Sequence, residues 1–131
     1  MPKYSKQSAG RLSTCDPRLQ DVFNEVIKHF DCSVLQGHRG EIEQNECVRR
    51  GTSKLKWPKS KHNSIPSKAA DVAPYPIDWS DRERFAHFAG FVLGIAALKG
   101  VKLRWGGDWN QDRKSKDERL FDGPHFEIIG K

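Results

Sequence analysis

Apolar residues recur at three- and four-residue steps in the first quarter of the chain. One stripe at helical spacing consists of Leu19, Val22, Phe23, Val26, Ile27 and Phe30. Asp16 can cap such a helix, and Pro17 suits its first turn because the missing N–H has no helical partner there. The pattern predicts a helix with one face toward the core. Residues 1–13, which are mostly polar, are interpreted as a lead-in to the domain.

A second long helix is predicted from Ser80 to about Lys99. Ser80 and Glu83 have the spacing of a capping box, and Gly100 is a typical stop signal. We expect this helix to be the central one of the core, because its apolar positions are numerous: Phe85, Phe88, Val92, Leu93, Ile95 and Ala96. Residues 41–50 predict a shorter helix between the two.

Short apolar runs bounded by turn residues predict the strands, which are residues 32–36, 69–73, 101–105 and 125–129. A long loop at 52–68 and a charged loop at 110–119 separate some of these elements. Because helices and strands are partly segregated, the fold class is predicted to be α+β, a small antiparallel sheet backed by about three helices. The length of 131 residues fits a single domain, 1–131.

The composition is that of a soluble globular domain, with 36% hydrophobic and 31% charged residues. No apolar stretch is long enough for a membrane helix, and the polar N-terminus lacks the pattern of a signal peptide. We therefore expect synthesis in a cytoplasm, no stable membrane insertion and a monomer. The cysteines, Cys15, Cys32 and Cys47, form no Cys-x-x-Cys pair and are expected to be free thiols.

The net charge of +6 favours an anionic partner. Nucleic acid, a membrane surface and an anionic cell-wall polymer all fit this charge. The chain has no helix-turn-helix, zinc-finger or ribonucleoprotein signature, so nucleic acid is the least expected of the three.

Two segments contain candidate catalytic residues, and each adjoins a predicted strand. His62, Asp71 and His125 offer two imidazoles and a carboxylate, a ligand set that suits catalytic zinc with an open position for water. Zinc lowers the pKa of bound water to roughly 7. Asp122, three residues before His125, could then act as general base. The spacing alone leaves open that these histidines are ordinary surface or structural residues.

Several further pieces of sequence occur in the order found in a known family: Gln36-Gly37-His38-Arg39, Ser60-Lys61-His62, Pro66-Ser67-Lys68-Ala69-Ala70-Asp71, Pro74-Tyr75-Pro76-Ile77-Asp78-Trp79, Trp105-Gly106-Gly107-Asp108-Trp109-Asn110 and Asp122-Gly123-Pro124-His125. With these pieces the chain resembles the VanX/VanY-type D-Ala-D-Ala peptidases, a group of zinc metallopeptidases related to the hedgehog signalling domain. Within the group it is most similar to phage endolysins that cleave the L-alanyl-D-glutamate bond of peptidoglycan.

The resemblance implies a role for each matching residue. It places the zinc ligands at His62, Asp71 and His125, the catalytic carboxylate at Asp122 and a substrate-polarising arginine at Arg39. Many relatives have glycine three residues after the first histidine. Here that position is Ile65, and nine residues separate the first two ligands, which is longer than the commonest spacing.

Other candidates near these motifs have two interpretations each. Ser60 either binds substrate or caps a turn, and Trp105 and Asp108 either form a wall of the substrate cleft or pack in the core. Glu127 could orient a ligand histidine, but a strand residue facing solvent is the expected role.

The resemblance implies a zinc-dependent phage endolysin that acts on bacterial peptidoglycan. Such an enzyme would wait in the host cytoplasm and reach the cell wall after the inner membrane is breached. A D-Ala-D-Ala dipeptidase or carboxypeptidase would use the same metal chemistry. A basic, non-enzymatic module that binds nucleic acid is the alternative from another class.

Overall fold

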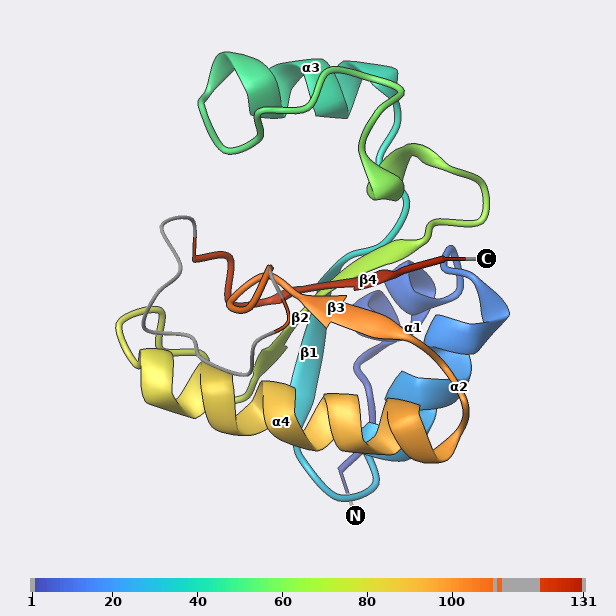
Figure 1. Ribbon diagram of the computed structural model, residues 1–131, viewed down its shortest axis with the longest axis vertical. Coiled ribbons are helices and arrows are strands. Elements are labelled where there is room, and N and C mark those ends of the chain that lie inside the picture. The colour runs from blue at the N-terminus through green and yellow to red at the C-terminus, as the bar shows by residue number, and fades with distance from the viewer. Residues whose placement is uncertain (1, 110, 112–120, 131) are drawn as a thin grey trace.

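The computed structural model describes residues 2–109, 111 and 121–130. Its centre is a four-stranded sheet in the order β1-β2-β4-β3, and every neighbouring pair is antiparallel (Figure 1). The strands are β1 (Cys32–Gln36), β2 (Ala69–Pro74), β3 (Leu103–Trp105) and β4 (His125–Ile128). All four lie where the sequence predicts strands.

The described residues form four α-helices and one short 3-10 helix: α1 (Lys6–Leu12), α2 (Pro17–Val26), α3 (Glu41–Arg49), α4 (Arg82–Leu98) and η1 (Lys61–Asn63). Helices α2 and α4 pack against each other and cover one side of the sheet, whereas α3 stands apart on the other side (Figure 1). The α+β prediction is confirmed. No helix among the described residues combines the length and apolar character that a membrane span requires.

The strand β4 separates the core from the opposite side of the sheet. Phe126 is fully buried, and its ring packs edge-on against Phe23 of α2 and Phe88 of α4 at 5.5 and 6.1 Å between centroids. Because successive side chains of a strand point to opposite faces, His125 and Glu127 project away from this apolar layer. One side of the sheet is therefore the core, and the other carries polar side chains.

Two helix boundaries differ from the sequence predictions. Helix α2 ends at Val26, one turn early, and the ring of Phe30 packs against Phe88 at 5.0 Å instead of extending the helical stripe. The predicted cap of α4 is also wrong. Asp81 accepts the N–H of Arg84 at 3.1 Å, because the hydroxyl of Ser80 already donates to Asp78 at 2.7 Å.

The predicted lead-in, residues 1–13, contains the helix α1, which packs against β1. Ser8 and Leu12 are buried, and the Ser8 hydroxyl accepts the N–H of Val34 at 3.0 Å. Tyr4 donates to the carbonyl of Phe23 at 2.7 Å. The segment is thus part of the fold, and the polar pattern hid this because a buried serine replaces an apolar residue at the contact.

All three cysteines are free, and Cys15 and Cys32 are buried as small apolar groups. Gly106 and Gly107 form a turn after β3, as predicted. The predicted charged loop 110–119 lies outside the described residues except for Gln111.

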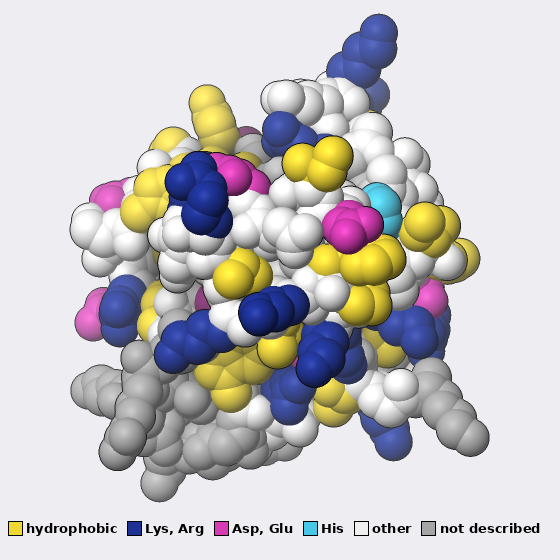
Figure 2. Space-filling model, turned by 90° about the horizontal axis from the view of Figure 1, so that it is seen from above, with side chains coloured by type: hydrophobic (Ala, Val, Ile, Leu, Met, Phe, Trp, Pro, Cys, Tyr) yellow, Lys and Arg dark blue, Asp and Glu magenta, His cyan; other side chains and the backbone are white. Residues whose placement is uncertain are grey.

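The face that is seen from above in Figure 1, on the side of α3, shows how charge is distributed there. Lysine and arginine side chains are interspersed with acidic and hydrophobic ones (Figure 2). Among the residues that the structure describes, positive charge on this face is therefore spread out and does not form a single continuous stripe.

Candidate metal centre

The register of β2 and β4 brings two of the three candidate ligands, Asp71 and His125, together. Asp71 pairs directly with His125 across the two antiparallel strands. Side chains of directly opposed residues lie on the same face, about 5 Å apart at Cβ. Two residues that are 54 positions apart in the sequence therefore become neighbours on the polar side of the sheet.

His62 reaches the same place from η1, the short helix before β2. Ser60 caps this turn, because its hydroxyl accepts the N–H of His62 at 3.3 Å. The imidazole Nδ1–H donates to the carbonyl of Gly37 at 2.8 Å, which turns Nε2 toward Asp71. The ring is 2% exposed. The loop thus fixes both the position of His62 and the nitrogen that it offers to a ligand.

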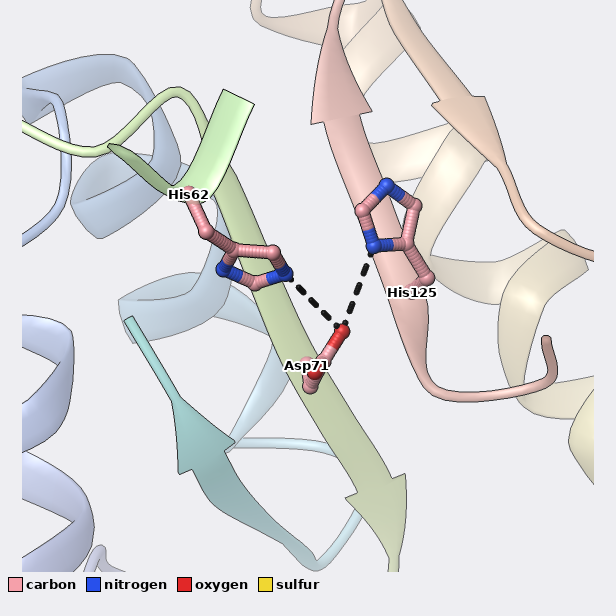
Figure 3. Close-up of side chains that lie close together, drawn as sticks. All are labelled: His62, Asp71 and His125. Atoms are coloured by element: carbon pink, nitrogen blue, oxygen red, sulfur yellow. Dashed lines mark hydrogen bonds and ion pairs between the residues drawn. The ribbon is translucent and has the colours of Figure 1, made fainter. Parts of the chain in front are cut away.

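The three side chains converge on one point (Figure 3). His62 Nε2 and His125 Nδ1 each lie 3.3 Å from Asp71 Oδ1, and one ligand atom from each residue lies within 4.8 Å of the others. Among the described residues, His62 Nε2 is buried and has no hydrogen-bond partner of good geometry. An orphaned imidazole nitrogen beside a carboxylate and a second imidazole fits a divalent metal, and nitrogen and oxygen donors suit zinc.

Glu127 fixes the second histidine. His125 Nε2–H donates to Glu127 Oε1 at 2.8 Å, which leaves Nδ1 on the side of Asp71. Glu127 is itself held by Arg104 at 2.7 Å and Lys61 at 3.5 Å. It is 6% exposed, so the expectation of a solvent-facing residue is wrong. The signal was present in the sequence, since residues two apart on a strand share a face.

The side chains of this cluster shift one another's pKa values toward the charged forms. Burial raises the pKa of Asp71, but the hydrogen bond from His125 and the neighbouring ring of His62 outweigh it and hold the pKa below its usual value. Burial lowers the pKa of His125, yet the bonds to Asp71 and Glu127 raise it to about 9. For Glu127, hydrogen bonds from His125 and Arg104 overcome burial and lower the pKa to about 2. Without metal, the cluster therefore holds a proton on His125.

Asp122 lies beside this cluster through a tight turn. Its carbonyl accepts the N–H of His125 at 3.1 Å, and its own N–H donates to Gly106 at 2.8 Å. A Cβ on Gly106 would overlap the Asp122 backbone, so only glycine allows this approach. Burial and the nearby charge of Asp71 raise the pKa of Asp122. A carboxyl group with a raised pKa is suited to exchanging protons near neutral pH.

Arg39 lies next to Asp71 of the candidate centre. Its Nη2 lies 3.7 Å from Asp71 Oδ2, and its side chain is 11% exposed. The guanidinium donates to Gln36 at 3.3 Å and to Gln44 at 3.0 Å. The backbone N–H of Arg39 donates to the carbonyl of His62 at 2.8 Å, so the two segments are joined directly.

Gln44 was not predicted from the sequence to be part of the site. It is fully buried in α3, and its amide nitrogen donates to Ser53 at 2.9 Å and to Leu55 at 2.6 Å. Its carbonyl oxygen also accepts from Asn63 at 3.2 Å. This one side chain therefore ties α3 and the following loop to the segments of Arg39 and His62. A glutamine within a polar helix carries no pattern that predicts such burial.

The three predicted substrate residues lie in different settings. Ser60 is buried and caps η1. Trp105 is buried in the core, and its indole N–H donates to Gly123 at 2.7 Å. Asp108 is buried in the turn after β3, and its N–H donates to Trp105 at 3.0 Å. Their contact with substrate stays a prediction. The ring centroids of Trp109 and His125 lie 5.3 Å apart.

Comparison with known proteins gives one consistent result. The chain is 36% identical over 136 residues to the L-alanyl-D-glutamate peptidase of Escherichia phage T5, covering 97% of this chain and 98% of the relative. The crystal structure of the Serratia marcescens L-Ala D-Glu endopeptidase ChiX matches with a TM-score of 0.77 and 28% identity, over 96% of this chain and 90% of that one. A family model described as phage L-alanyl-D-glutamate peptidase matches residues 1–129, and the chain belongs to that family.

Proposed function

We propose that this protein is a zinc-dependent peptidoglycan peptidase that hydrolyses the L-alanyl-D-glutamate bond of cell-wall stem peptides. The observation that carries the proposal is the convergence of His62, Asp71 and His125 beside Asp122, in a chain of this family. His62 would offer Nε2, His125 would offer Nδ1 and Asp71 its carboxylate. The bonds of the other two ring nitrogens to Gly37 and Glu127 support this choice of atoms.

Four side chains of the protein have a role in the proposed mechanism. A bound zinc ion supplies a Lewis acid that makes water a nucleophile near neutral pH. Asp122 takes a proton from the attacking water and delivers it to the leaving amine, a role that its raised pKa suits. Arg39 directs its N–H donors at the carbonyl oxygen, where negative charge develops. Gln36 and Gln44 hold the guanidinium in place for this role.

The proposed peptidase activity also indicates where the protein acts. We propose a phage endolysin that is made in the host cytoplasm and acts on peptidoglycan once the inner membrane is breached. The net charge of +6 would concentrate such an enzyme on the anionic bacterial envelope.

The test combines metal content with product masses. Purified protein is stripped with a chelator, reloaded with zinc and incubated with purified peptidoglycan, and the products are weighed by mass spectrometry. We expect activity only with metal, and new termini at alanine and glutamate. Full activity in metal-free protein would exclude the mechanism, and release of terminal D-alanine alone would indicate a D-Ala-D-Ala peptidase.

Two variants separate the roles of base and ligand. Asp122→Asn should keep zinc and lose turnover by about 10²–10⁴-fold, the usual range for a general base. His62→Ala should lose zinc as well. Equal zinc content in both variants, measured by elemental analysis, would contradict the assignment of roles.

A further inference from the structure

A pocket of about 250 Å³ opens next to Asp122, on the side of α4. Its wall includes Trp79, Arg82, Phe85 and Phe121, and Asp122 itself forms part of the lining. The rings of Trp79 and Phe85 are stacked, with centroids 5.6 Å apart and an angle of 19° between the planes. The mechanism proposed above gives this pocket no role, although it shares the proton-transferring carboxylate.

Arg82 is the basic residue of the lining. It is the first residue of α4, and its guanidinium carbon lies 4.4 Å from the centroid of the Phe121 ring. Across residues 2–109 and 121–130, no carboxylate lies within the 4.0 Å of an ion pair with Arg82, which is exposed. A cation held by an aromatic ring and without a carboxylate partner in these segments can take an anionic group of a ligand.

The chemistry of the scissile bond identifies that anionic group. Asp122 delivers a proton to the leaving amine, so the pocket that contains Asp122 lies on the leaving-group side. The leaving amine belongs to D-glutamate, an amino acid with two carboxyl groups. One of them continues the stem peptide, and the other remains a free carboxylate within a few bonds of the amine.

We propose that Arg82 binds the free carboxylate of the D-glutamyl residue, while the exposed ring of Trp79, which stacks on the buried Phe85, contacts its aliphatic part. This inference rests on the proposed function and adds the residue that recognises the leaving group. Arginine suits the task because its planar donors can hold a carboxylate with two hydrogen bonds. Arg82 is thus a specificity determinant, distinct from Arg39, which faces Asp71.

The test uses two synthetic stem peptides that differ in one functional group. Both contain L-alanyl-D-glutamate, but in one peptide the free carboxylate is converted to the neutral carboxamide. For the wild-type enzyme with zinc, we expect kcat/KM to be about tenfold higher for the acid, as for a partly exposed charge-assisted hydrogen bond. Arg82→Gln should lose this preference, mainly through a higher KM for the acid, and Arg82→Lys should keep part of it.

The outcomes distinguish this inference from the proposed function. If the wild type cleaves neither peptide, the proposed function fails. If it cleaves both equally well, or if Arg82→Gln keeps the full preference for the acid, the role of Arg82 is wrong and the peptidase function stands. Arg50→Gln removes a positive charge from the end of α3, and this control should keep the wild-type preference. Because the wild-type comparison needs no variant, the inference remains testable if Arg82→Gln folds poorly.

Discussion

The two histidines of the centre are oriented by opposite means. His62 is held through a neutral backbone carbonyl, that of Gly37, in a segment pinned by backbone and amide hydrogen bonds. His125 is held through the charged Glu127, which is itself paired with Arg104 and Lys61. The His62 side therefore depends on chain geometry, and the His125 side depends on electrostatics.

The two sides should therefore respond differently to substitution. A change that moves the backbone near Gly37 would displace His62 and weaken the fold at the same time. A change of charge at Glu127 would leave the backbone intact, but it would alter the ring of His125 and the pairing of Arg104 and Lys61. Backbone structure and metal affinity should thus change together on the His62 side and separately on the His125 side.

Gly37→Ala is expected to have the largest effect. An added Cβ would overlap the Thr14 hydroxyl and the carbonyl of Arg11, and the latter is backbone that cannot rotate away. We expect a loss of about 3 kcal/mol in the free energy of unfolding, the upper range for overpacking. Zinc affinity should fall with it. Gly40→Ala is the control, because nothing lies within 4 Å of its added Cβ. Equal urea denaturation curves for the two variants would refute the geometric account.

Glu127→Gln tests the electrostatic side. Glutamine keeps the size of the side chain and can still accept from His125, but it removes the negative charge. We expect zinc affinity to fall by about 10–100-fold, as for other groups that orient metal ligands. The backbone should change little, which circular dichroism spectra would show. Glu83→Gln, in the first turn of α4, is the matched control for loss of charge. An unchanged zinc affinity in Glu127→Gln would remove the basis of the comparison.

Protein that has been stripped of metal should reveal the proton that a bound zinc ion would replace. The pKa of His125 is raised from 6.5 to about 9, so its protonated form stabilises the folded state. This contribution is fully present below pH 6.5 and is lost as pH rises through 9. We expect Tm with chelator to fall by about 10 °C over this range, a change of roughly 2–3 kcal/mol.

Zinc should reverse this trend, because binding requires the unprotonated ring and strengthens as pH rises. Melting curves at several pH values, with chelator and with zinc, measure both slopes. In Glu127→Gln the fall without metal should be shallower, since Glu127 is one of the groups that raise the pKa. A rising Tm in chelator would contradict the assignment.

Ser60→Ala should have the smallest effect. Its hydroxyl caps η1 next to His62, and loss of a cap costs about 1 kcal/mol. Below the melting transition, KM should stay within about twofold of the wild-type value if capping is the whole role, since only the fold then loses a contact. A KM that rises with kcat unchanged would instead support the predicted contact of Ser60 with substrate.

The sequence predicts the elements better than their ends. Strong apolar periodicity locates α2 and α4. The cap of α4 is harder to predict, because Ser80 and Asp81 are both polar and neighbours. The hydroxyl of Ser80 bonds to Asp78, so Asp81 caps the helix. Helix α1 has too few apolar residues to be recognised, because Ser8 makes its buried contact through a hydrogen bond.

The site is predictable to the extent that short motifs carry it. The grouping of His62, Asp71 and His125 follows from family motifs, and the structure brings these residues together. Glu127 could have been placed by strand alternation, since it shares a face with His125. Gln44 could not, because its burial depends on how α3 docks on the loops around Ser53 and Leu55.

The direct pairing of Asp71 with His125 makes the spacing within these strands intolerant of insertions and deletions. Inserting one residue immediately before His125 in β4 would move every later side chain of the strand to the opposite face. An aromatic ring would then point into the metal centre, and an imidazole would enter the apolar layer. Variation in chain length is therefore expected in the connecting segments and excluded from the two strands.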